Sequence, residues 1–146
     1  MKKFYSVPDT AFVKIVPQPV QHLSIASMAK SLEGEVVFYT MEGRYSLTTH
    51  EVIRKKLAER PPIDGVIFFR LGQFMAEGLS QAAILRSILE AGYSVHFARE
   101  RISIASEADL ARYFPMMYAY RALEARDTSP GAFTKQLLDC GMLGSP

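Results

Sequence analysis

Gly65-Val66-Ile67-Phe68-Phe69-Arg70-Leu71 is the stretch of this chain that decides its fold. It is rich in β-branched and aromatic residues, and Arg70 is its only charged residue. Runs of this kind form strands that are buried on both faces, as in a parallel sheet covered by helices. Three similar runs lie at residues 12–16, 36–39 and 94–98. The sequence therefore predicts four strands, with 36–39 and 65–71 at the centre of the sheet.

Helical periodicity fills the segments between these runs. Ile25, Met28, Ala29 and Leu32 follow the i, i+3, i+4, i+7 spacing of a helix that begins near Pro19. Thr48 and Glu51 form a capping-box pattern for a second helix, which ends at Pro61-Pro62, and a third helix covers residues 79–91. Ser106 and Asp109 begin a fourth helical segment that extends to about residue 126, with a kink or break expected at Pro115.

Strands and helices therefore alternate along the chain, which is typical of a parallel α/β sheet with right-handed crossovers. We expect one three-layer α/β domain over residues 1–146, with a mainly parallel four-stranded sheet of resolvase-like or flavodoxin-like type. Residues 127–146 form a C-terminal extension with its own helical pattern at Phe133, Leu137 and Leu138.

Composition excludes several classes of protein. The 146 residues are 49% hydrophobic and 22% charged, which is typical of a globular domain and not of a disordered chain. Cys140 is the only cysteine, so a disulfide scaffold is excluded. The 17 basic residues barely exceed the 15 acidic ones, which disfavours nucleic acid as a partner. No apolar run of about 18 residues predicts membrane insertion, and we expect a soluble, cytoplasmic protein.

Polar side chains follow each predicted strand, and ligands of open α/β sheets bind beyond the carboxyl ends of the strands. Arginines at this edge would form an anion pocket, because their planar guanidinium groups bind phosphate or carboxylate. The alternative is that they are solvated and pair with Glu42, Glu77 and Glu100. The predicted substrate-binding residues are Gln18, Gln21, Arg44, Tyr45, Arg70, Gln73 and Arg99.

Familiar catalytic motifs are absent, and no catalytic residue is assigned. There is no Gly-x-Gly-x-x-Gly or Walker-type loop, and the three histidines and Cys140 lack metal-ligand spacing, so we expect no cofactor and no metal. Glu42 and Glu100 are candidate bases. His96 is either a core histidine or a proton carrier, and the glutamines either bind sugar hydroxyls or satisfy backbone groups at the strand ends.

The layout resembles the catalytic domain of serine recombinases, or resolvases, which is a parallel α/β sheet. The run at 12–16 takes the place of that family's first strand, and residues 68–73 look like its Leu-Asp-Arg-Leu-Gly-Arg motif. In this comparison Arg70 is retained, but the nucleophilic serine falls on Val16 and the second arginine on Gln73. Because valine has no oxygen to attack a phosphodiester, we expect no strand exchange.

A closer resemblance is to sporadic carbohydrate cluster proteins, small bacterial proteins encoded in polysaccharide biosynthesis gene clusters. Val-Pro-Gln-x-x-Gln is matched at residues 16–21, and Met-x-Gly-x-Tyr at residues 41–45. An Asp-Gly with an apolar strand and a Gln-containing turn is matched at 64–73, and His-Phe-Ala with a following Glu at 96–100. The resemblance covers about two-thirds of the chain and implies a role in carbohydrate biosynthesis.

Three functions are compatible with these observations. The first is a small enzyme or ligand-binding protein that acts on a phosphorylated sugar or nucleotide-sugar in surface polysaccharide biosynthesis. The second is a non-catalytic oligomeric partner or scaffold of a carbohydrate-cluster enzyme. We expect a homodimer that uses the aromatic and methionine-rich segment 113–120, because that much exposed apolar surface would be a liability. The third and least favoured is a decayed recombinase-like DNA-binding domain.

Overall fold

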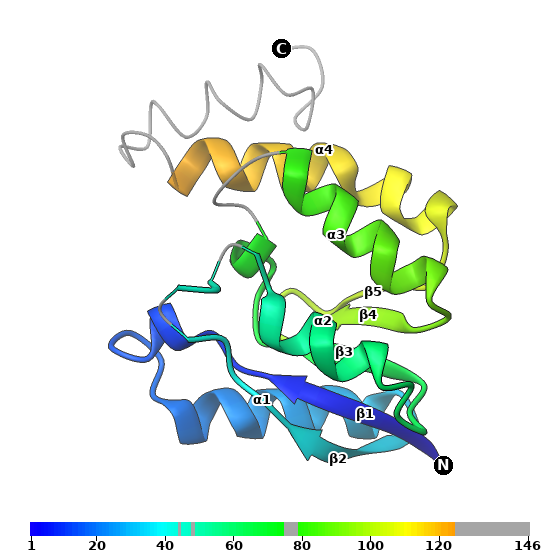
Figure 1. Ribbon diagram of the computed structural model, residues 1–146. Coiled ribbons are helices and arrows are strands. Elements are labelled where there is room, and N and C mark those ends of the chain that lie inside the picture. Colours follow the sequence, from blue (N-terminus) through cyan, green and yellow to red (C-terminus); the bar gives the residue numbers. More distant parts are fainter. Residues whose placement is uncertain (44, 48, 75–78, 125–146) are drawn as a thin grey trace.

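The computed structural model describes residues 1–43, 45–47, 49–74 and 79–124 (Figure 1). The predicted C-terminal extension, Thr48 of the predicted capping box and Arg44 lie outside the described residues. In chain order the elements are β1 (Lys2–Val7), α1 (Gln18–Ser31), β2 (Gly34–Tyr39), α2 (Glu51–Ala58), β3 (Gly65–Phe68), α3 (Leu79–Glu90), β4 (Ser94–Phe97), β5 (Ile102–Ile104) and α4 (Glu107–Glu124), with short 3-10 helices at Thr10–Phe12 and Leu71–Phe74.

The strands form one mixed sheet in the order β2-β1-β3-β4-β5. The first four strands in this order are parallel, whereas β5 pairs antiparallel with β4 at the sheet edge. The prediction of a mainly parallel α/β sheet is confirmed, but the sheet has five strands instead of four. The extra strand spans three residues, which is too short to produce a recognisable pattern in the sequence.

The predicted first strand at residues 12–16 is wrong. The chain forms a 3-10 helix at Thr10–Phe12 and then turns, and the side chain of Ile15 is 71% exposed. The first strand is instead β1, which lies between β2 and β3 and is buried from Phe4 to Val7. Only the first two residues of β1, Lys2 and Lys3, are exposed. These two lysines masked the apolar run that follows them.

The predicted position of the second strand also needs correction. β2 is an edge strand that pairs only with β1, and its last residues, Phe38 and Tyr39, are exposed. Its apolar composition had indicated a central strand. The central position belongs to β1 and to β3, whose four residues are all buried. This part of the prediction, which placed residues 65–71 at the centre, is confirmed for Gly65–Phe68.

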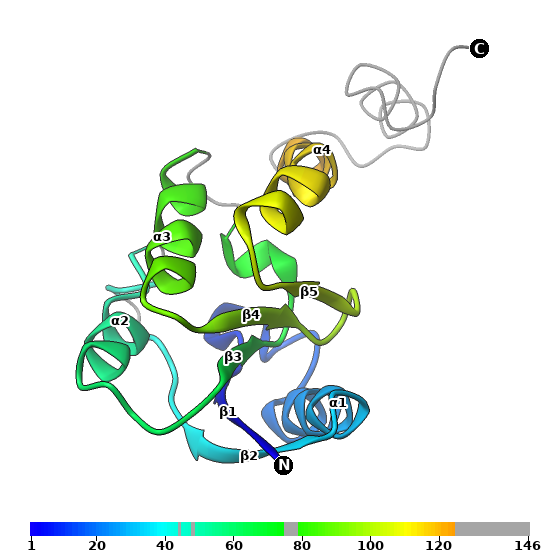
Figure 2. The same ribbon diagram turned by 90° about the vertical axis from the view of Figure 1, so that its right-hand side faces the viewer.

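Helices cover both faces of the sheet, so the domain has three layers (Figure 2). α1 packs on one face through a small cluster that includes Ile25, Met28 and Ile67. α2, α3 and α4 cover the other face, where a larger cluster joins Leu57, Leu85, Leu110 and the β-strand side chains between them. No helix among the described residues is long and apolar enough to span a membrane.

The first turn of α4 is capped as its sequence predicts. The Ser106 hydroxyl accepts a hydrogen bond from the Asp109 amide (3.2 Å), and the Asp109 carboxylate accepts one from the Ala105 amide (2.9 Å). The helix continues past Pro115, so the expected break is wrong. Proline has no amide hydrogen, so the carbonyl of Ala111 loses its hydrogen bond within the helix. Both Ala111 and Pro115 are exposed. Water can therefore satisfy that carbonyl.

His96 is buried on the face of β4 that α1 covers. Its Nε2 lies 2.8 Å from the Ser94 hydroxyl and its Nδ1 lies 2.7 Å from the Ser103 hydroxyl, while its ring meets the Phe4 ring edge-on. Burial lowers the pKa of His96 to about 4, and the positive charge of Lys2 acts in the same direction. The ring is therefore neutral in the folded protein at physiological pH.

We predict that the folded state loses stability through His96 as the pH falls from 6.5 to about 4. In this window the unfolded state takes up the proton and the folded state does not, so acid favours unfolding by up to about 3 kcal/mol. Denaturant unfolding of the wild type and of His96→Gln at several pH values measures the effect. The variant should show a shallower loss of stability, and identical pH profiles would contradict the prediction.

Candidate functional site

A cavity of about 220 Å³ lies at the carboxyl ends of the parallel strands. Its walls come from the segments that follow β1, β2 and β3, which is where ligands of open α/β sheets bind. The lining residues are Pro8, Asp9, Thr10, Ala11, Glu42, Leu47, His50, Arg70, Gly72 and Gln73. Three of the predicted site residues, Glu42, Arg70 and Gln73, therefore lie together here.

An ion pair between Asp9 and Arg70 joins the ends of β1 and β3. Arg70 Nε lies 2.6 Å from Asp9 Oδ2, and both side chains are largely buried. The other carboxylate oxygen of Asp9 accepts the Ala11 amide, and the guanidinium group lies 4.0 Å from the centre of the Phe12 ring. These contacts fix the orientation of both charges, as charge-assisted hydrogen bonds and stacking of arginine on an aromatic ring do.

Two glutamines hold the backbone around this ion pair. The buried Gln21 side chain accepts the Asp9 amide (2.7 Å) and donates to the carbonyls of Asp9 and Val16. The Gln73 side chain accepts the Arg70 amide (3.0 Å) and donates to the carbonyls of Val7 and Pro8. Both glutamines thus satisfy backbone groups at the strand ends, and of the two only Gln73 lines the cavity.

The buried Glu42 carboxylate caps the N-terminus of α2. One oxygen accepts the Ile53 amide (2.9 Å), and the other accepts the Val52 amide (3.0 Å) and the Ser46 hydroxyl (2.7 Å). The first amides of a helix lack intrahelical partners, and a negative charge there is favoured by the helix dipole. Glu42 therefore holds the helix, in the role that the sequence assigned to Thr48.

His50 and Thr10 complete the polar lining. His50 precedes α2 in a left-handed conformation (φ 51°), and its ring stacks on Phe74 with 4.1 Å between the ring centres. His50 Nε2 lies 2.9 Å from the Gln73 carbonyl oxygen, which can only accept, so this nitrogen carries a hydrogen. The Thr10 hydroxyl donates to the Glu42 carbonyl (2.9 Å) and ties the β1 loop to the β2 loop.

Arg99 and Glu100 lie beside the ion pair, and neither of them lines the cavity. The guanidinium group of Arg99 is 5.3 Å from the centre of the Phe12 ring, which Arg70 also contacts. A Glu100 oxygen accepts the Leu71 amide (2.8 Å). Burial raises the pKa of Glu100, although its backbone hydrogen bonds and the charges of Arg99 and Arg70 oppose the rise. Burial therefore favours the protonated form of the Glu100 carboxyl.

The remaining predicted site residues do not line the cavity. The Gln18 amide contacts His22 on α1 (3.2 Å), Tyr45 is 93% exposed, and His96 is buried on the face covered by α1. Among the residues that the structure describes, no three His, Cys, Asp or Glu side chains gather closely enough to hold a metal ion.

The sequence analysis missed Asp9, Thr10 and His50. Asp9 and Thr10 directly follow Val7, the last residue of β1, so assigning the first strand to residues 12–16 hid them. Val7-Pro8-Asp9 was the available signal, because a proline and an acidic residue often end a strand. No sequence pattern indicated that His50 lines the cavity, because its position depends on the loop that joins β2 to α2.

The comparison with solved structures finds a similar fold in a resolvase-family site-specific recombinase from Streptococcus pneumoniae. The TM-score is 0.60 at 14% sequence identity, and the match covers 92% of this chain and 98% of the recombinase chain. The fold is resolvase-like. At this identity the likeness concerns the fold alone. No protein-family model and no curated protein sequence matches the chain.

The resolvase-like fold corrects one detail of the residue comparison. Val16 was placed at the end of the first strand, where the recombinases carry their serine. That strand ends at Val7 and is followed by Pro8, Asp9 and Thr10. The argument against strand exchange that rested on Val16 therefore no longer holds.

We predict that Glu42→Ala destabilises the protein by about 2–4 kcal/mol, because two helix amides and the Ser46 hydroxyl lose their acceptor. Glu42→Gln, which retains one acceptor oxygen, should cost less. Glu59→Ala, at the exposed end of the same helix, is the matched control and should change stability by less than about 0.5 kcal/mol. Denaturant unfolding measures all three, and equal stabilities of Glu42→Ala and Glu59→Ala would exclude the capping role.

Proposed function

We propose that this chain binds a phosphorylated sugar or a nucleotide-sugar at the carboxyl edge of its sheet, as a small enzyme or ligand-binding protein of surface polysaccharide biosynthesis. The observation that carries the proposal is the cavity where Asp9, Glu42, Arg70 and Gln73 converge. The resemblance of residues 16–21, 41–45, 64–73 and 96–100 to sporadic carbohydrate cluster proteins supplies the biological context.

The chemistry of the lining suits a polyhydroxylated ring. Carboxylates accept hydrogen bonds from sugar hydroxyls, and the Gln73 amide can both donate and accept. With Asp9 and Glu42 facing one Arg70, the cavity itself holds no excess of positive charge. A phosphate is therefore better placed outside it, at Arg99, which is exposed and shares the Phe12 ring with Arg70.

Glu100 is the group that we assign to proton transfer in this proposal; it is not a lining residue of the cavity, but its carboxyl accepts the Leu71 amide next to Arg70. Its raised pKa brings it closer to the range in which a general acid is effective near neutral pH. Glu42 has a different role, because its carboxylate caps α2 through three hydrogen bonds. His96 is unsuited because it is buried on the face of β4 that α1 covers and its pKa is about 4.

We predict that a panel of sugar 1-phosphates and nucleotide-sugars contains a ligand that raises the melting temperature. Arg70→Ala should weaken its binding by about 1.5–3 kcal/mol, because Arg70 lines the cavity and fixes the Asp9 carboxylate there. Because Arg70→Ala also leaves Asp9 without its partner, Arg99→Ala is the cleaner variant, with a loss of about 1 kcal/mol at its exposed position. Isothermal titration calorimetry measures the affinities.

Arg86→Ala is the matched control for this experiment, because Arg86 pairs with Glu107 between α3 and α4 and lies outside the cavity. It should leave the affinity unchanged. If no member of the panel shifts the melting temperature, or if Arg99→Ala and Arg86→Ala behave alike, the proposed site is contradicted.

A second candidate is an oligomeric partner of a carbohydrate-cluster enzyme. One observation favours it: Tyr118 on α4 is 56% exposed within the aromatic and methionine-rich segment. Much of that segment serves the core, since Met117 and Ala119 are buried and Tyr113 and Met116 pack against the larger cluster. Among the side chains of this segment that the structure describes, the exposed apolar surface therefore centres on Tyr118 and is smaller than the sequence indicated.

We predict that light scattering gives a molar mass of twice 16.3 kDa for the wild type. Tyr118→Glu should shift the mass toward that of a single chain, because it places a charge in the apolar contact. Leu23→Glu, at an exposed apolar position on α1, is the control and should not. A single-chain mass that does not change with concentration would contradict the dimer.

A further inference from the structure

The polar side chains of the cavity at the carboxyl edge direct their donors to the protein itself. The Thr10 hydroxyl donates to the Glu42 carbonyl (2.9 Å), and His50 Nε2 donates to the Gln73 carbonyl (2.9 Å). The Gln73 amide nitrogen in turn donates to two backbone carbonyls at the end of β1 (3.3 and 3.4 Å). Because a carbonyl oxygen can only accept, the direction of these hydrogen bonds is fixed.

Acceptors, in contrast, remain for a ligand. The Thr10 oxygen can still accept after donating its hydrogen. A carboxylate offers about four acceptor positions, of which Glu42 uses three. The Asp9 carboxylate accepts from the Ala11 amide and from Arg70 Nε and has further positions. A ligand in this cavity must therefore supply most of the hydrogen-bond donors.

The charge of the Glu42 carboxylate has no cationic partner among the residues that the structure describes. Asp9 is paired with Arg70, whereas Glu42 accepts only from two helix amides and the Ser46 hydroxyl. The dipole of α2 offsets about half an elementary charge. With histidine counted as neutral, the described lining residues carry two negative charges and one positive charge. The cavity therefore favours a positive charge on its ligand.

Two observations indicate what should carry this charge. No three His, Cys, Asp or Glu side chains among the described residues gather closely enough to hold a metal ion. The volume of about 220 Å³ is below the usual range of small-molecule sites and suits a single sugar ring. An ammonium group on such a ring donates three hydrogen bonds, which matches a wall that offers acceptors.

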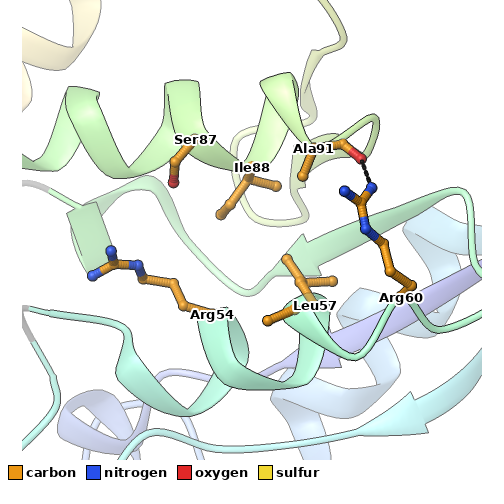
Figure 3. A pocket seen from close by; sticks show the side chains of 7 residues that line it. Arg54, Leu57, Arg60, Ser87, Ile88 and Ala91 are labelled. Atoms are coloured by element: carbon orange, nitrogen blue, oxygen red, sulfur yellow. Dashed lines mark hydrogen bonds between the residues drawn. The ribbon is translucent and has the colours of Figure 1, made fainter.

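A neighbouring cavity between α2 and α3 has the opposite charge. It has a volume of about 320 Å³, and Arg54 and Arg60 line it with Leu57 and Ile88 between them (Figure 3). No acidic side chain is among its described lining residues. An ammonium group is repelled there and attracted to the carboxyl edge, so the charge of a ligand distinguishes the two cavities.

We propose that the cavity at the carboxyl edge selects an amino sugar, whose ammonium group donates to Glu42 and Thr10 while hydroxyls of the ring donate to Asp9. This inference rests on the proposed function and names the class of sugar within it. The phosphate lies outside the cavity at Arg99, so the two charges of the ligand meet protein groups of opposite charge. N-acetylation removes the positive charge of the amine and adds bulk, so an N-acetylated sugar should be a poor ligand.

The test is isothermal titration calorimetry of the full chain with glucosamine 1-phosphate and glucose 1-phosphate, which differ only in the group at carbon 2. Glucosamine 1-phosphate should bind about tenfold more tightly, the difference expected for one charge-assisted hydrogen bond. N-acetylglucosamine 1-phosphate should bind about tenfold more weakly than the free amine for the same reason. At about pH 9.5, above the range in which α-amino groups titrate, the preference for glucosamine 1-phosphate should be lost.

Three variants locate the ammonium group. Glu42→Gln removes the charge but keeps one acceptor oxygen for the helix, and it should reduce the preference to less than about twofold. Glu59→Gln removes the same charge from the exposed end of α2 and should retain the full preference. Arg60→Gln, in the neighbouring cavity, should also retain it. The comparison of the two ligands at two pH values in the wild type does not depend on the stability of any variant.

The outcomes separate this inference from the proposed function. If glucose 1-phosphate binds as tightly as glucosamine 1-phosphate, or if Glu42→Gln retains the tenfold preference, the amino-sugar proposal is overturned and the proposed function stands. The same conclusion follows if only neutral sugars of the wider panel bind. If no sugar 1-phosphate or nucleotide-sugar binds, the proposed function fails together with this inference.

Discussion

The Asp9–Arg70 ion pair is the contact on which the carboxyl edge of the sheet depends. It joins the loop after β1 to the loop after β3, and the Gln21 and Gln73 side chains anchor the backbone of its two members. Both charges are largely withdrawn from water, so removing either one breaks a buried ion pair, which commonly costs several kcal/mol. The ion pair therefore sets the shape of the cavity, and a ligand there would meet charges whose positions are already fixed.

Glu42 extends this organisation to the loop after β2. A carboxylate offers about four acceptor positions, and three at Glu42 are occupied by the Val52 and Ile53 amides and the Ser46 hydroxyl. The same residue thus caps α2 and lines the cavity, and it retains room for one further donor, such as a sugar hydroxyl. A preformed set of acceptors of this kind lowers the entropic cost of binding.

The sequence predicted an element correctly where its pattern of apolar or capping residues lies within that element. The buried run of β3, the spacing of α1 and the Ser106–Asp109 cap were all readable, because each depends on neighbours within one element. The sequence analysis did not predict β1, because two exposed lysines precede its apolar half. It did not predict β5, because that strand is very short. Arg70, Gln73 and Glu42 could be placed at the carboxyl edge because each follows a predicted strand. The Asp9–Arg70 contact spans 61 positions and depends on which strand lies beside β3, which no local pattern contains.

α2 extends this organisation away from the carboxyl edge of the sheet. Its first residue follows the loop that lines the cavity, and its 8 residues correspond to about 12 Å of helix. The Val52 and Ile53 amides donate to Glu42 at the start of the helix, while Ile53 and Leu57 pack into the larger core cluster along its length. One buried carboxylate therefore connects the wall of the cavity to the core on the face of the sheet that α2 covers, so a change at Glu42 should alter both together.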